Sequence, residues 1–227
     1  MAYSKKSTLK VARTGRYFTL NSVNKQTKNI WIVFHGYGQL AEYFIKHFEN
    51  LDLEENFVIA PEGLSRFYID GTSGRVGASW MTKEDRDDEV MDQTDYLNSV
   101  IENCGVNPEL DAHRIIILGF SQGTATAVRW FTNRGFRPSQ LILWAGSFPH
   151  DVSPKMHSTI FENLPTHFVY GTEDPFLQHI NMHNKAAEFE QMGLDLNLWT
   201  FDGKHIMDKP MLDKIVNSFT PSKEIRK

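Results

Sequence analysis

Several short runs of apolar residues follow one another along the chain, and in most of them hydrophobic side chains succeed each other without alternation. A strand with one solvated face alternates apolar and polar residues, so an unbroken run is typical of a strand covered on both faces. Parallel sheets provide that environment. The sequence therefore predicts a mostly parallel sheet with strands at Ile30–Phe34, Phe57–Ala60, Ile115–Leu118, Leu141–Trp144, Phe168–Tyr170 and Leu196–Phe201.

Amphipathic segments lie between these runs. The segment Val90–Ile101 repeats its apolar residues at helical spacing, and Gly105 supplies a stop. Near the end of the chain, Pro210 can open a helix that Pro221 closes. The alternation of strands and helices predicts an α/β fold with helices on both faces of the sheet.

The segment Leu9–Leu20 differs, because polar and apolar residues mix around Thr14 and Gly15. We predict an antiparallel edge hairpin here, before the parallel part of the sheet. The interval between Trp144 and Phe168 is too short for a multi-helix cap, so no large cap domain is expected. The length of 227 residues and the lack of a linker or repeat predict a single domain over residues 1–227.

Composition excludes several classes of protein. With 41% hydrophobic and 23% charged residues the chain has an ordinary globular mix, and its net charge of −4 gives no footprint for nucleic acid or an anionic membrane. No apolar stretch approaches the ~18 residues of a membrane span, and the N-terminal segment has no signal-peptide core. One cysteine cannot form an internal disulfide. The expectation is a soluble cytoplasmic protein.

A Gly-x-Ser-x-Gly motif, Gly119–Gly123, directly follows a predicted buried strand and precedes a helical stretch that starts at Thr124. A sharp turn from strand to helix exposes the central serine, and flanking glycines let the backbone make that turn. The helix N-terminus favours negative charge developing there. Ser121 is therefore the candidate nucleophile; the alternative is a glycine-rich turn with an incidental serine.

A serine hydroxyl needs a neighbouring base to become a nucleophile. In folds with this strand-turn-helix motif, the serine comes first in the chain, then an aspartate or glutamate, and then the histidine that acts as the base. His205 comes just after the last predicted strand, in a loop that can reach the serine, whereas His167 begins a strand at the opposite edge. The loop after the preceding strand offers Glu173 and Asp174, and we choose Asp174 from the loop pattern. Taken alone, an aspartate before a proline is also a common turn.

Acyl transfer also needs N–H donors for the oxyanion. One is the backbone N–H of Gln122, the residue after the nucleophile. The other is expected in the loop after the first parallel strand, His35–Gly38, and we assign it to the backbone N–H of Tyr37. We interpret His35 as a structural histidine that holds this loop.

Four segments together resemble the phospholipase/carboxylesterase family of α/β hydrolases, which includes the acyl-protein thioesterases: His35–Gly38, Arg114–Gly123, Gly171–Asp174 and Gly203–His205. The resemblance implies the α/β-hydrolase fold and a serine hydrolase that cleaves carboxylic esters or thioesters without a cofactor. Ser79-Trp80 resembles the Ser-Trp of the family's acyl-site loop, which makes Trp80 a candidate for substrate contact, and Phe176 borders the proposed site.

The chain departs from the family's pattern at three positions. Gln39 stands where many members carry an acidic residue, Met81 where an aromatic residue is usual, and Thr124 where glycine is frequent. None of the three belongs to the predicted catalytic set.

We predict a serine carboxylesterase that acts on a small-molecule ester, with Ser121 as nucleophile, His205 as base and Asp174 as the residue that orients it. An acyl thioesterase is the nearest alternative, since its chemistry is the same. Outside the enzymes, the alternative is a catalytically silent binding protein of the same fold. A peptidase is a weaker alternative, because no peptide-binding subsite is evident.

His179 and His183 lie four residues apart on a predicted helix and could face one metal ion. A metal site needs a third ligand, and no HExxH pattern accompanies the pair. We therefore interpret them as part of a solvated helix face and expect no metal site.

Overall fold

The computed structural model describes residues 3–177, 189 and 193–219. Within these residues a seven-stranded sheet has the order β1-β3-β2-β6-β7-β8-β9. All neighbouring strands are parallel except the β1–β3 pair, which is antiparallel. The strands are β1 Tyr17–Leu20, β2 Asn29–Phe34, β3 Asn56–Pro61, β6 Ile115–Phe120, β7 Gln140–Trp144, β8 Pro165–Gly171 and β9 Asp195–Phe201. Every predicted parallel strand is present.

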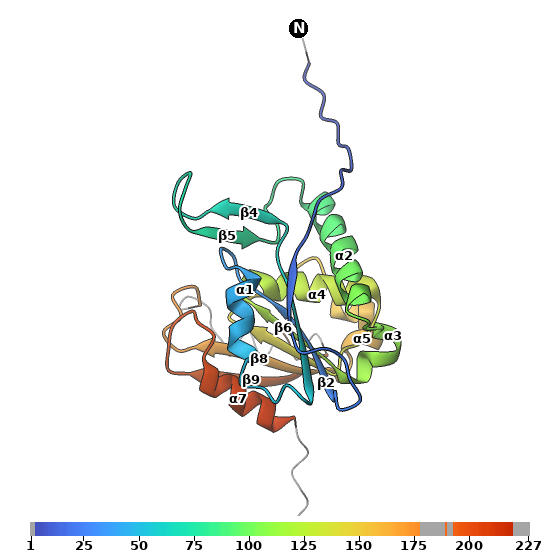
Figure 1. The fold of residues 1–227 in the computed structure, drawn as a ribbon, viewed down its shortest axis with the longest axis vertical. Helices are drawn as coiled ribbons and strands as arrows, with labels where there is room; N and C mark the ends of the chain where they lie inside the picture. The colour runs from blue at the N-terminus through green and yellow to red at the C-terminus, as the bar shows by residue number, and fades with distance from the viewer. Residues whose placement is uncertain (1–2, 178–188, 190–192, 220–227) are drawn as a thin grey trace, which may run out of the picture.

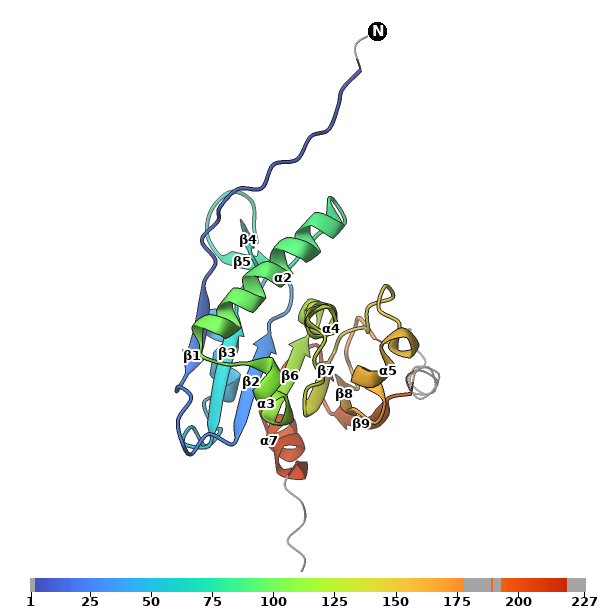
Figure 2. The same ribbon diagram turned by 90° about the vertical axis from the view of Figure 1, so that its right-hand side faces the viewer.

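Helices cover both faces of this sheet (Figure 1). They are α1 Ala41–Phe44, η1 Ile45–Phe48, α2 Arg86–Asn103, α3 Pro108–Asp111, η2 Ala112–Arg114, α4 Gln122–Arg134, η3 Pro154–His157, α5 Ser158–Phe161 and α7 Lys209–Ser218. In Figure 2, α2, α4 and α5 lie in front of the sheet. No helix within the described ranges is long and apolar enough to cross a membrane.

Each central strand contributes to two hydrophobic cores. In β2, Ile30 and Ile32 pack with the side chains of α2, α4 and α5, whereas Trp31 and Val33 pack with those of α1, η1 and α7. All four side chains are fully buried. Burial on both faces is the reason that the strand has an unbroken apolar sequence.

The N-terminal edge strand is present, but it pairs differently from the prediction. Only Tyr17–Leu20 of the segment Leu9–Leu20 forms a strand, and its partner is β3, not a second strand of the same segment. An isolated two-stranded hairpin is marginally stable in water, whereas β3 offers an edge on an existing sheet. The residues before β1 extend away from the sheet (Figure 1), with Lys6 paired to Asp85 of the turn before α2.

A second, two-stranded sheet was not predicted. Strands β4 Ser65–Tyr68 and β5 Val76–Ser79 form an antiparallel hairpin between β3 and α2. It projects from the end of the molecule where the N-terminal segment leaves the fold (Figure 1). Asp70-Gly71 lies in the turn between its strands, and this dipeptide is a sequence signal for a hairpin. Between β7 and β8 the chain forms only η3 and α5, so no large cap is inserted there.

Candidate active site

Ser121 occupies the strained turn that the motif predicts, between the end of β6 and the start of α4. Its φ is 52° and its ψ is −117°, in a region that residues other than glycine rarely adopt. The flanking glycines make the turn possible, because a Cβ on Gly119 would overlap the backbone of Thr124 and one on Gly123 would overlap the carbonyl oxygen of Phe34. The Ser121 N–H donates to the Trp144 carbonyl of β7 over 2.8 Å.

Asp174 and His205 are joined by a hydrogen bond. The loop after β8 carries Asp174, the loop after β9 carries His205, and His205 Nδ1 lies 2.7 Å from Asp174 Oδ2. The aspartate is 1% exposed, and its other oxygen, Oδ1, accepts from the Phe176 N–H over 2.9 Å. Glu173 is exposed, and its backbone N–H donates to the Gly203 carbonyl over 2.9 Å.

The close packing of the two loops depends on Gly171. A Cβ at this position would overlap the backbone carbonyl of Gly203. Since β8 and β9 are parallel neighbours that end at Gly171 and Phe201, the two loops leave the same edge of the sheet side by side. The register of these strands therefore brings the aspartate to the histidine.

Two residues connect the loop of His205 with the serine turn. Phe120, the residue before Ser121, packs against the His205 ring with the ring centroids 5.0 Å apart. Trp144 accepts from the Ser121 N–H and donates its indole N–H to the Ile206 carbonyl over 2.9 Å. In the described part of the chain, no direct hydrogen bond joins the Ser121 hydroxyl to His205.

The loop after β2 is held by the groups around it. His35 is fully buried; its Nε2 accepts from the Gly63 N–H over 3.0 Å, so its Nδ1 carries the proton and donates to the Gly36 carbonyl over 2.7 Å. The Gly36 N–H donates to Gln39 Oε1 over 2.7 Å, which gives Gln39 a role in the turn. His35 therefore holds this loop, as the sequence indicated, and Tyr37 lies at its tip with a ring that is 62% exposed.

The β4–β5 hairpin fixes the same loop from outside. The Gly38 N–H donates to the Ala78 carbonyl over 2.9 Å, and the Ala78 N–H donates to the Gln39 carbonyl over 3.1 Å. The Tyr37 ring stacks on Phe67 of β4 at 5.0 Å between centroids. Sequence reasoning missed these hairpin contacts, because backbone pairing between distant segments leaves no motif in either of them.

The side chain of Gln122 connects the hairpin to the serine turn. Its Oε1 accepts from the Trp80 N–H over 3.1 Å, and its Nε2 donates to the Met81 carbonyl over 2.9 Å. Its side chain therefore holds the chain just after β5. As the first residue of α4, Gln122 has a backbone N–H without a partner inside the helix.

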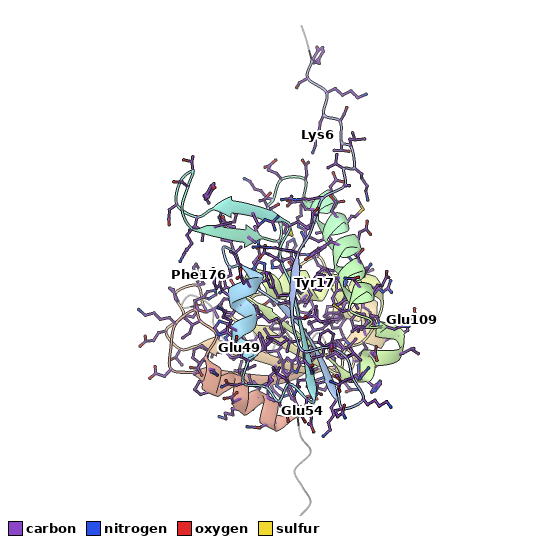
Figure 3. The ribbon with its side chains drawn as sticks, viewed as in Figure 1. Lys6, Tyr17, Glu49, Glu54, Glu109 and Phe176 are labelled. Atoms are coloured by element: carbon purple, nitrogen blue, oxygen red, sulfur yellow. The ribbon has the colours of Figure 1, made fainter. Side chains whose placement is uncertain are left out.

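The structure places the two candidate substrate contacts in different environments. Trp80 is 1% exposed; its ring stacks on His35 at 4.8 Å, and its indole N–H donates to the His35 carbonyl over 2.8 Å. These contacts support the loop after β2, and substrate contact by Trp80 stays a prediction. Phe176, which is labelled in Figure 3, is 72% exposed and packs edge-on against His205.

Replacing Gly77 by alanine is expected to lower kcat roughly 100-fold through the loop that carries Tyr37. A Cβ at this position of β5 would lie 2.5 Å from the Gly38 carbonyl oxygen, so the loop would have to move. Steady-state kinetics with a p-nitrophenyl ester measures the effect. Gly71→Ala is the control. It strains the backbone at the tip of the same hairpin, but a Cβ there has open space and does not push on the loop of Tyr37. Equal losses in both variants would contradict this role of Gly77.

Two histidines outside the candidate catalytic set make stability depend on pH. Burial lowers the pKa of both His35 and His167 to about 4, below the usual 6.5. Between these values the unfolded chain binds protons that the folded chain does not, so stability is full above about pH 6.5 and is lost as the pH falls toward 4. The expected loss in the free energy of unfolding is on the order of 3 kcal/mol for each histidine. Urea unfolding at a series of pH values measures it.

The variant His167→Gln should remove the part of that pH dependence that His167 contributes. His113→Gln, at an exposed histidine, is the matched control and should leave the dependence as it is in the original chain. A free energy of unfolding that stays constant between pH 7 and pH 4 would contradict the prediction.

His167, the alternative base, lies apart from the Asp174–His205 pair. His167 lies in β8, near its amino end, where Nε2 bonds to Gln140 Oε1 over 3.0 Å and Nδ1 accepts from the Trp199 indole over 2.9 Å. His179 and His183 lie outside the described residues. Within the described ranges, no group of three or more histidine, cysteine or acidic side chains could hold a metal ion.

Comparisons with known proteins agree with this fold. Esterase PE8 aligns with 91% of this chain and 98% of its own at 18% identity, with a TM-score of 0.67. The carboxylesterase from Mesorhizobium loti aligns over 91% and 95% at 14% identity and a TM-score of 0.68. Acyl-protein thioesterase 2 from Zea mays aligns over 91% and 98% at 16% identity and a TM-score of 0.64. No curated protein sequence matches the chain.

At these identities the solved structures show a common fold. A family model for the phospholipases/carboxylesterases matches residues 16–221, which include the serine turn, the Asp174–His205 pair and the loop after β2. The chain therefore belongs to the phospholipase/carboxylesterase family of α/β hydrolases.

Proposed function

We propose that this protein is a serine carboxylesterase with Ser121, Asp174 and His205 as its catalytic triad. The observation that carries the proposal is the 2.7 Å hydrogen bond between Asp174 and His205. These residues lie in the loops after β8 and β9, on the same side of the sheet order as β7, which neighbours the strand of the serine turn. With Nδ1 donating to the aspartate, the neutral ring has its lone pair on Nε2, as a general base requires.

Hydrolysis proceeds in two halves. Ser121 Oγ attacks the acyl carbon while His205 Nε2 takes its proton, and the carbonyl oxygen becomes an oxyanion that the N–H groups of Tyr37 and Gln122 bind. The C–O bond to the alcohol then breaks, and His205 returns the proton to the departing oxygen. Water attacks the acyl-enzyme by the same route, releases the acid and restores the Ser121 hydroxyl.

The remaining parts of the proposal rest on the sequence. We take residues 1–227 as one domain in the cytoplasm, with a small-molecule ester as substrate and no cofactor. Phe176 and Trp80 remain candidate substrate contacts.

An acyl thioesterase is the second candidate, because the same three side chains cleave C–S and C–O acyl bonds and a thioesterase from Zea mays shares the fold. A panel of p-nitrophenyl esters and acyl-CoA thioesters, ranked by kcat/KM, separates the two. Higher values for the esters support a carboxylesterase, and higher values for the thioesters support the second candidate. No turnover on either series would favour a silent binding protein.

A further inference from the structure

The residue Phe176 contacts both partners of the Asp174–His205 hydrogen bond. Its backbone N–H donates to Asp174 Oδ1 over 2.9 Å, and its ring centroid lies 4.7 Å from that of His205, with the ring planes at 65°. The contact with His205 leaves 72% of Phe176 exposed to solvent. The ring therefore borders solvent on one side and the imidazole on the other.

One hydrogen bond fixes the distance of the His205 ring but leaves rotation about that bond free. The bond is made by Nδ1, so such a rotation would change the direction in which Nε2 points. Two phenyl rings restrict this rotation. The ring centroid of Phe120, at the end of β6, lies 5.0 Å from that of His205, and the ring centroid of Phe176, in the loop after β8, lies 4.7 Å from it. Phe120 is buried and part of the core, whereas Phe176 belongs to the short turn that also carries the aspartate.

We infer that Phe176 is a positioning residue, whose ring holds His205 in the orientation that directs Nε2 at the Ser121 hydroxyl. The inference rests on the proposed function, and it assigns the ring a task other than binding substrate. Positioning acts on the chemical step, so it lowers kcat when lost, whereas a uniform substrate contact acts on KM.

The variant Phe176→Ala removes the ring and keeps the backbone N–H that bonds to Asp174. We expect kcat to fall by ~10- to 100-fold with KM nearly unchanged, by the same factor for p-nitrophenyl acetate and p-nitrophenyl butyrate. Phe176→Leu should recover part of the loss, because a branched apolar side chain still packs against the imidazole. Tyr43→Ala removes a similarly exposed ring, 60% accessible, from α1 and should leave kcat unchanged.

Two further measurements separate positioning from other roles. Labelling of the serine by diisopropyl fluorophosphate needs the same base but presents no acyl chain, so its rate should fall with kcat in Phe176→Ala. The NMR resonance of the His205 Nδ1 proton, which lies in the hydrogen bond to Asp174, should broaden in Phe176→Ala and remain sharp in Tyr43→Ala. Circular dichroism confirms that each variant is folded.

A rise in KM with unchanged kcat would overturn the inference and make Phe176 a substrate contact. An unchanged Nδ1 resonance together with an unchanged labelling rate would overturn it as well. Failure of the proposed function has a different signature: the original chain would then hydrolyse no ester and resist labelling, while the Nδ1 resonance would still report whether the Phe176 ring orients His205.

Discussion

Replacing Ser121 by alanine is expected to lower kcat for p-nitrophenyl esters by about 10⁶-fold, leaving only the small residual catalysis that the oxyanion donors and substrate binding supply. The reason is that no acyl-enzyme can form without the hydroxyl, and His205 then has no nucleophile to activate. The substitution should leave the fold intact, because alanine at φ 52° carries a backbone strain similar to that of serine. Stopped and continuous assays of p-nitrophenol release measure the loss.

A fluorophosphonate probe should label the original chain at Ser121 alone, because only an activated serine reacts with it. Peptide mapping by mass spectrometry identifies the site. Ser99→Ala, on the exposed surface of α2, is the matched control and should keep both turnover and labelling. Labelling that persists in Ser121→Ala would show that another residue is the nucleophile.

Replacing Asp174 by asparagine is expected to lower kcat by about 10⁴-fold while the protein stays folded. The amide can donate to His205 Nδ1, which favours the tautomer that carries its proton on Nε2 and cannot accept one there. The Phe176 N–H can still bond to the amide oxygen, so the turn keeps one of its two contacts. The pre-steady-state rate of p-nitrophenol release measures the loss in the acylation step.

Glu173→Gln is the matched control for this substitution, because the neighbouring residue is exposed and its hydrogen bond to the loop of His205 is made by its backbone N–H, which the substitution keeps. We expect kcat within a few-fold of the original chain. If Glu173→Gln is instead the damaging change and Asp174→Asn is mild, the proposed triad has the wrong carboxylate.

Local chemistry made the fold class and part of the site predictable. Burial on both faces gave β2 its unbroken apolar sequence, and a strand of that kind can be identified without knowing its neighbours. The strained turn at Ser121 was also predictable, because its two glycines mark it in the sequence. Gly119 is required by its contact with the backbone a few residues away, and Gly123 by its contact with the end of β2.

The choice between two adjacent acids was not determined in the same way. Glu173 and Asp174 occupy one loop and carry the same charge, so charge does not distinguish them, and the sequence favoured Asp174 through the loop pattern alone. The register of β8 on β9 and the close contact of Gly171 with Gly203 decide which carboxylate is buried against His205. Those contacts join residues about thirty positions apart.

The buried strands, the helices between them and the serine turn were predictable from the order of residues, because each depends on interactions among residues close together in the chain. Three other features follow from the tertiary structure: the pairing of β1 with β3, the support of the Tyr37 loop by the β4–β5 hairpin, and the position of Trp80 beneath that loop. The physical reason is that backbone hydrogen bonds between distant segments use N–H and C=O groups that nearly every residue carries. Such pairing is therefore selected by the packing of the whole fold.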